Sequence, residues 1–383
     1  MARPLKPPVR GSAGQAGTPD HGPGADADRR PEQPPRRGRL PLGWTIVLMA
    51  AAAVLVYLGL SRLAGLEATW RRLSSGDPFW LCGAALLEVG SYAAYVFTFH
   101  RLFARPGSPI GWRESYDISL AGVAASRVFA TAGVGGIALT TWALDRSGME
   151  RRKLVSRLTT FYVLLYGIFM AALTVTGVGL RTGVLSGPAP FGLTVVPAIF
   201  GGVVIVVALA AARLPSDLGR RLARRLHDHE RAAKLVGLVA DGAATLAEGV
   251  RGALHLVRTR DPALVGAFCW WAFDIAVLWA CFEAFGEPPA GGVLVMGYLT
   301  GTLGNVVPLP GGLGGVEGAM VGAFLGFDVD GGLAVTAVLA YRAFQYWLPI
   351  IPAVVAYPRL LRTVGRWDEQ RRAAVGTAGA GGQ

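Results

Sequence analysis

The chain contains few of the residues on which most metal and redox chemistry depends. Its 383 residues include three cysteines and five histidines, and 25 acidic residues stand against 37 Lys and Arg. Cys82, Cys269 and Cys281 all lie inside apolar stretches, where cysteine behaves as a small hydrophobe. Neither a disulfide framework nor a zinc site is supported, so we expect no metal and no cofactor.

Motifs of the common enzyme classes are also missing. There is no Ser-His-Asp arrangement with a nucleophile elbow, no phosphate-cradling Walker sequence and no paired Cys-x-x-Cys motif. We therefore expect the chain not to be an enzyme. An integral membrane transferase is the least favoured alternative, because no group that would activate an acceptor is visible.

Long hydrophobic runs are what the sequence does have. Hydrophobic residues make up 52% of the chain, and several runs of about 20 residues match a hydrocarbon core roughly 30 Å thick. The sequence predicts an all-α polytopic integral membrane protein. The net charge of +12 comes from Arg and Lys clustered between the apolar runs, as in cytoplasmic loops, so membrane lipids rather than nucleic acid are the expected partners.

The composition divides the chain into five segments. Residues 1–41, rich in Pro, Gly and Arg, predict a disordered basic tail in the cytoplasm. The segments that follow are a membrane half at 42–212, a basic amphipathic cytoplasmic linker at 213–262, a second membrane half at 263–358 and a cytoplasmic tail at 359–383. Spanning helices are expected at 42–63, 79–103, 158–180, 191–212, 263–285 and 333–357.

Two further apolar regions, 116–144 and 291–327, are each too long for one straight crossing and carry Gly near the middle. Basic residues flank the first region on both sides, whereas the second is flanked by Glu287, Asp328 and Asp330 without Lys or Arg. The positive-inside bias therefore predicts two broken, re-entrant helical hairpins that enter from opposite faces, with both chain termini in the cytoplasm.

The tips of these hairpins resemble each other. The segment from Ser126 to Gly136 aligns without gaps to the segment from Asn305 to Gly315 and shares three glycines. This echo predicts an inverted repeat, an arrangement that places substrate sites near the bilayer midplane in many transporters. The alternative is a chance match in a chain with 53 glycines.

Glu317 and Arg342 are the strongest candidates for a binding site. Both are expected at membrane depth, where an ionised side chain needs a counter-charge, a headgroup or water. An ion pair that only stabilises the fold is the alternative. Tyr341 and Gln345 flank Arg342 and are candidate hydrogen-bonding partners. The glycine turn supplies the other candidates for substrate contact: Asn305, Pro310, Gly311 and Gly312.

Arg127, next to Ser126 in the first hairpin, is a further candidate. A guanidinium group matches phosphate oxygens with a bidentate fork, so Arg127 is expected to bind a lipid phosphate unless it reaches out to the cytoplasmic interface. Glu88 and Asp274 are mid-segment carboxylates. Each is interpreted either as a proton-relay group or as a buried hydrogen-bonded acid.

The motif Pro308-x-Pro310-Gly311-Gly312-x-Gly314, with Glu317 downstream and Tyr341-Arg342 in the last predicted span, resembles the lysylphosphatidylglycerol synthase transmembrane region family, also called UPF0104 membrane proteins. The resemblance covers roughly residues 43–360. In the bifunctional members of this family, the membrane region looks like a flippase for aminoacylated phospholipid and is joined to a soluble synthase domain. The sequence ends at Gln383 without that domain, so aminoacyl transfer is not expected.

The expected function is therefore a flippase-like translocase for an anionic, aminoacylated or polyprenyl-linked lipid. High Ala, Gly and Arg usage favours a bacterial inner membrane as its location. The alternative is a membrane accessory subunit that does not transport and instead supports a separately encoded lipid synthase or glycosyltransferase.

Overall fold

The computed structural model describes residues 75–104, 108–128, 134–213, 230–306 and 314–380. All of them fall within one of the chain's two units, Leu58–Gln383. The helices and one short 3-10 turn are the only regular elements in these ranges, and no strand is present among them. The predicted basic tail and the span expected at 42–63 lie outside the described residues.

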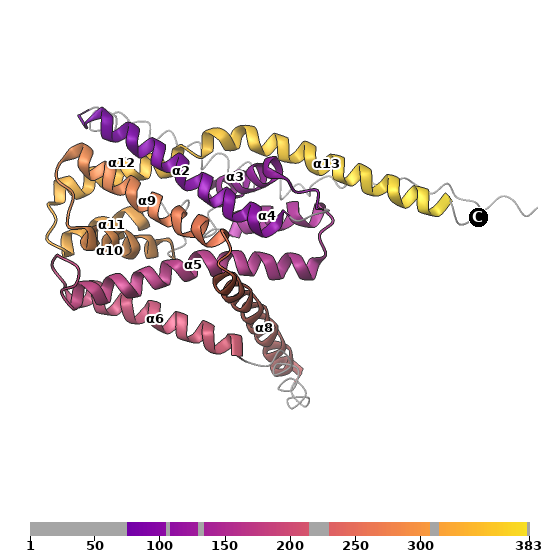
Figure 1. Ribbon diagram of the computed structural model, residues 1–383, viewed down its shortest axis with the longest axis horizontal. Helices are drawn as coiled ribbons and strands as arrows, with labels where there is room; N and C mark the ends of the chain where they lie inside the picture. Colours follow the sequence, from indigo (N-terminus) through magenta and orange to yellow (C-terminus); the bar gives the residue numbers. More distant parts are fainter. Residues whose placement is uncertain (1–74, 105–107, 129–133, 214–229, 307–313, 381–383) are drawn as a thin grey trace, which may run out of the picture. The chain divides into compact units, whose positions relative to one another are not determined.

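Long apolar helices form the frame. These are α2 (Pro78–Phe103), α5 (Arg151–Arg181), α6 (Phe191–Arg213) and α9 (Ala263–Phe285) (Figure 1). Together with the stretch Gly331–Ala373, they make five described helical segments that are long and apolar enough to cross a membrane. The predicted all-α polytopic class is confirmed, and α9 has the bounds expected from the sequence.

Both interrupted regions form hairpins of short helices. The first consists of α3 (Trp112–Val128) and α4 (Val134–Arg146), and the second of α10 (Gly291–Thr302), the 3-10 turn η1 (Leu303–Val306) and α11 (Gly315–Gly326). The two legs of each hairpin pack on each other. In Figure 1 the second hairpin joins its neighbours α9 and α12 at the end of the helices where α5 meets α6, whereas α4 joins α5 at the other end.

Equivalent helices begin at a nearly constant separation along the chain. Ser126 and Asn305 are 179 residues apart, and so are the first residues of α3 and α10, Trp112 and Gly291. Helices α5 (from Arg151) and α12 (Gly331–Trp347) begin 180 residues apart. The spacing of the similar hairpin tips is therefore shared by the helices around them, which supports a structural repeat.

The last predicted span, 333–357, was expected to be one helix, and this prediction is wrong toward its C-terminal end. Helix α12 ends at Trp347, and α13 (Ile350–Ala380) begins after a two-residue break at Leu348 and Pro349. Pro349 has no amide hydrogen with which to continue the hydrogen-bond ladder of α12. The regular helix therefore stops there, although Leu348 keeps a helical conformation and its amide still donates to the carbonyl oxygen of Phe344. Helix α13 then runs through the segment expected to be a tail from residue 359.

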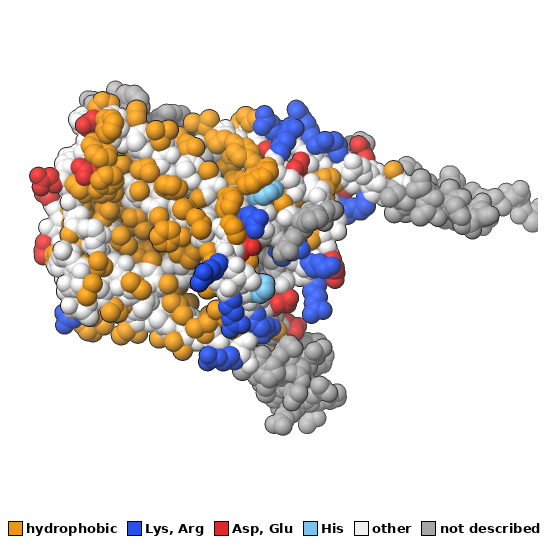
Figure 2. Space-filling view, in the orientation of Figure 1, with side chains coloured by type: hydrophobic (Ala, Val, Ile, Leu, Met, Phe, Trp, Pro, Cys, Tyr) orange, Lys and Arg blue, Asp and Glu red, His pale blue; other side chains and the backbone are white. Residues whose placement is uncertain are grey.

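A long helix, α8 (Glu230–Thr259), packs against α5 and α6. Its glycines allow a close approach, because a Cβ added at Gly249 or Gly252 would collide with Thr159 or Thr160 of α5. Figure 2 shows a broad apolar face over the helices, with Lys and Arg gathered toward the end that carries α8 and α13. This distribution is typical of a membrane protein with one basic side.

Candidate functional site

The first turn of α11 is organised by Glu317. Gly314 precedes the helix with φ of +87°, a conformation that side chains with a Cβ rarely adopt. Its amide donates a hydrogen bond to Glu317 Oε2 at 2.8 Å. The carboxylate thus caps the helix that it belongs to, and its negative charge lies at the positive end of the helix dipole.

Arg342 on α12 reaches the same carboxylate. Its Nε donates to Glu317 Oε1 at 3.1 Å, and the two side chains are only 7% and 15% exposed. Arg342 also donates from Nη1 to Gln345 Oε1, one turn further along α12. The structure therefore brings Glu317 and Arg342 together as an ion pair, with Gln345 as a hydrogen-bonding partner of the arginine.

Tyr341, the neighbour of Arg342, is bonded elsewhere. Its hydroxyl donates to Asp274 Oδ2 on α9 at 3.0 Å, and Tyr298 of α10 donates to the same oxygen. All three side chains are buried, with exposures of 1% for Tyr341, 6% for Asp274 and 0% for Tyr298. Tyr341 thus links α12 to the buried carboxylate of Asp274 on α9. Its hydroxyl is not directed at the Glu317 carboxylate.

Asp274 matches the geometry of a buried hydrogen-bonded acid, one of the two interpretations made from the sequence. Glu88 on α2 is fully buried and lies within electrostatic range of Tyr341. The sequence reasoning missed Tyr298. The available signal was a tyrosine inside an otherwise apolar hairpin leg, because a buried phenol hydroxyl needs a hydrogen-bonding partner.

The remaining candidates are placed only in part. Asn305 is exposed in η1. Arg127 belongs to the last turn of α3, and the structure describes only its backbone. Pro310, Gly311 and Gly312 lie outside the described residues, so the contacts predicted for the turn stay predictions.

Comparisons with known proteins agree with this architecture. A family described as lysylphosphatidylglycerol synthase TM region matches residues 44–353. A UPF0104 membrane protein of Methanothermobacter thermautotrophicus is 24% identical over 338 residues, which cover 82% of this chain and 93% of the relative. Shorter matches to UPF0104 membrane proteins of the same organism are 33% identical over 87 residues and 34% over 79, and cover 25% and 24% of those relatives.

The shorter matches span 22% and 20% of this chain. The region matched by the family, by contrast, contains both hairpins and also Glu317, Arg342 and Asp274. The candidate site therefore lies inside the part of the molecule that carries the similarity.

Proposed function

We propose, since the chain belongs to the lysylphosphatidylglycerol synthase transmembrane region family, that this multi-pass membrane protein is a flippase-like lipid translocase. Its substrate would be an anionic, aminoacylated or polyprenyl-linked lipid, and its location a bacterial inner membrane with both termini in the cytoplasm. The proposal assigns no bond-making step to the chain.

The observation that carries the proposal is the ion pair of Glu317 and Arg342, whose arginine is buried and whose carboxylate is mostly buried. A buried ion pair contributes little net stability compared with well-packed apolar side chains, so a fold alone does not require one at this position. The pair joins α11 of the second hairpin to α12. Charged groups held between helices at membrane depth are typical of substrate pathways.

The pair also suggests how a headgroup would be accommodated. A lipid phosphate would compete with Glu317 for the guanidinium of Arg342, because a guanidinium binds carboxylate and phosphate with the same fork of donors. A cationic aminoacyl group would in turn pair with the released carboxylate. One internal ion pair would thus be exchanged for two pairs with the lipid, and no charge would be left unpaired in the apolar surroundings.

The hairpins supply the setting for this exchange. Backbone that departs from a continuous helix at membrane depth is stable only when it is buried in protein or lines a wet cavity. In the second hairpin, Gly314 departs from the helical conformation with a φ of +87°, three residues before Glu317. Transporters with repeated, broken helices use such breaks to direct backbone groups at substrates.

The test is a transport assay in proteoliposomes. Fluorescent phosphatidylglycerol, its lysyl derivative and a polyprenyl-phosphate sugar are compared for the native protein and Glu317→Gln. We expect the native protein to move one of these lipids and Glu317→Gln to reduce its rate at least tenfold. Glu287→Gln, which removes an exposed carboxylate before α10, is the matched control and should retain the native rate.

Equal rates for the native protein and Glu317→Gln would refute the role of the ion pair. If the folded native protein moves none of the three lipids, the accessory-subunit function is favoured instead. Stable co-purification with a lipid synthase or glycosyltransferase from the native membrane would then support that function.

A further inference from the structure

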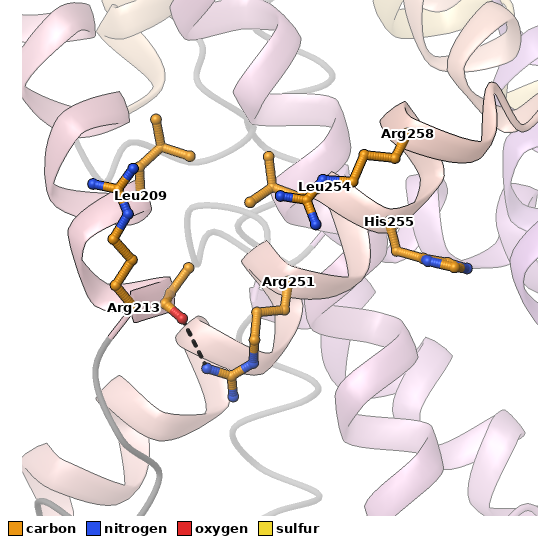
Figure 3. A pocket seen from close by; sticks show the side chains of 7 residues that line it. Leu209, Arg213, Arg251, Leu254, His255 and Arg258 are labelled. Atoms are coloured by element: carbon orange, nitrogen blue, oxygen red, sulfur yellow. Dashed lines mark hydrogen bonds between the residues drawn. The ribbon is translucent and has the colours of Figure 1, made fainter.

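A basic pocket lies between the C-terminal end of α6 and the second half of α8, away from the Glu317–Arg342 pair. Figure 3 shows this pocket, which has a volume of about 460 Å³. Two helix segments provide its lining: Leu209, Ala212 and Arg213 from α6, and Arg251, Leu254, His255 and Arg258 from α8.

The pocket is built on a hydrogen bond between the two helices. Arg251 Nη1 donates to the carbonyl oxygen of Ala212 at 3.1 Å. The last carbonyls of an α-helix have no partner within the helix, so Arg251 satisfies one of them at the end of α6. This bond holds α8 against α6 and places a guanidinium at the edge of the pocket.

The charge of the lining is of one sign. It contains three arginines and no carboxylate. Within the part of the chain that the structure describes, no Asp or Glu forms an ion pair with Arg213, Arg251 or Arg258. In Figure 3, Arg258 and Leu254 extend from α8 toward α6, while His255 points to the other side of α8. Clustered cations of this kind attract an anion.

An apolar surface leads to this cluster. On α6, Val203, Val206 and Val207 are 54%, 65% and 58% exposed, and Leu209 at the pocket is 37% exposed. Helix α6 is one of the membrane-length helices, so these side chains face the hydrocarbon region, and Arg213 marks the end of the crossing. A ligand at this place would therefore have an apolar part along α6 and an anionic part at the arginines.

We propose that the pocket binds the phosphate of an acidic phospholipid from the leaflet at the C-terminal end of α6. The guanidinium groups of Arg213 and Arg258 hold the phosphate oxygens, and the acyl chains lie along the exposed valines of α6. Basic pockets between membrane helices bind anionic headgroups in this way. The site is separate from the ion pair of α11 and α12, and its occupancy does not depend on lipid translocation.

The test uses the full-length protein in a zwitterionic detergent and native mass spectrometry. Phosphatidylglycerol, phosphatidylcholine and inorganic phosphate are titrated separately. The variant Arg213→Gln with Arg258→Gln leaves Arg251 and its bond to Ala212 in place. Since each arginine near a lipid surface contributes roughly fivefold to binding, the double variant should bind phosphatidylglycerol roughly 20-fold more weakly.

The matched control is Arg151→Gln with Arg152→Gln, which removes two exposed positive charges at the start of α5. Its affinity for phosphatidylglycerol should stay within twofold of native, and phosphatidylcholine should bind weakly to every variant. Arg213→Lys with Arg258→Lys, which keeps the charge, should recover most of the binding if the double glutamine variant is folded.

Native affinity for phosphatidylglycerol in the double glutamine variant, with a native unfolding temperature, would overturn the proposal. Inorganic phosphate that binds as tightly as phosphatidylglycerol would overturn it as well, because the apolar surface of α6 would then contribute nothing. If the native protein binds phosphatidylglycerol at this pocket but moves no lipid in proteoliposomes, that result would count only against the proposed function.

Discussion

The two hairpins share a backbone design but differ in their side chains. In the first, a Cβ added at Gly136 of α4 would overlap the carbonyl oxygen of Gly122 of α3. In the second, a Cβ at Gly304 would lie 2.6 Å from the carbonyl oxygen of Gly315. In both, glycine allows the two legs to approach backbone to backbone, and this close approach is what the repeat preserves.

The charged pair is not repeated. At the separation of 179 residues, the position of Glu317 corresponds to Ala138 and that of Arg342 to Val163. The first half of the molecule therefore has the scaffold without the ion pair. Both halves contain the helical hairpin, and only the second provides the proposed headgroup site.

The buried hydroxyl network is repeated in part. Asp274 and Tyr341 correspond to Tyr95 and Tyr162 of the first half, and these two tyrosines also interact with each other. The repeat thus keeps hydrogen-bonding groups between the equivalent helices. The acid itself appears only in the second half, where two tyrosine hydroxyls bond to it.

The largest expected effect comes from breaking the ion pair. Arg342→Ala leaves the mostly buried carboxylate of Glu317 without its counter-charge and should lower the free energy of unfolding by on the order of 3 kcal/mol, at the lower end of the range for buried pairs. The corresponding change in the first half, Val163→Ala, should lower it by about 1 kcal/mol. Thermal and denaturant unfolding in detergent micelles measure both.

The double variant Arg342→Met with Glu317→Leu removes both charges and serves as the control. It should regain most of the lost stability and still fail to move lipid. A double variant that transports at the native rate would show that the pair serves the fold alone.

An intermediate effect is expected from the glycines at which the two legs of each hairpin approach each other. Gly136→Ala and Gly304→Ala should each lower the free energy of unfolding by about 1–3 kcal/mol, because the added methyl group meets the backbone of the other leg. Gly318→Ala on α11, where a Cβ would meet no atom within 4 Å, should be neutral or slightly stabilising. An unchanged free energy of unfolding in either variant would mean that the two legs of that hairpin do not need glycine at their close approach.

The smallest effect concerns the hydroxyl network. Tyr341→Phe removes a hydrogen bond to Asp274 and should lower the free energy of unfolding by about 1.5 kcal/mol, while Tyr162→Phe in the first half should cost about 1 kcal/mol. The transport rate of Tyr341→Phe should change less than twofold, because this hydroxyl is bonded to Asp274. A tenfold loss of transport in a stable Tyr341→Phe protein would place Tyr341 in the substrate site.

Local pattern was sufficient for much of the fold. The apolar run of α9 predicted its bounds, and the interrupted runs predicted both hairpins, because apolar length and glycine interruptions are local properties of a chain in a bilayer. The break between α12 and α13 was missed, although Pro349 marks it in the sequence. The apolar run continues through that proline, so hydropathy alone joins the two helices.

The candidate site was predictable only to the level of residue types. A carboxylate and an arginine in apolar surroundings predict that each needs a partner, and this reasoning singled out Glu317 and Arg342. It could not distinguish the hydrogen-bonding roles of neighbours on one helix. Tyr341 and Arg342 are adjacent, but the two side chains leave α12 in different directions and reach Asp274 and Glu317, respectively.

The sequence by itself determined the class of the protein, the approximate positions of most apolar helices that the structure describes, and the family to which the chain belongs, since all three follow from local composition and motif. Only the tertiary structure decided which buried charges meet, that the repeat extends beyond the hairpin tips, and that arginines from α6 and α8 line one pocket. These depend on contacts between helices far apart in the chain, where packing of whole surfaces, rather than any local preference, selects the neighbours.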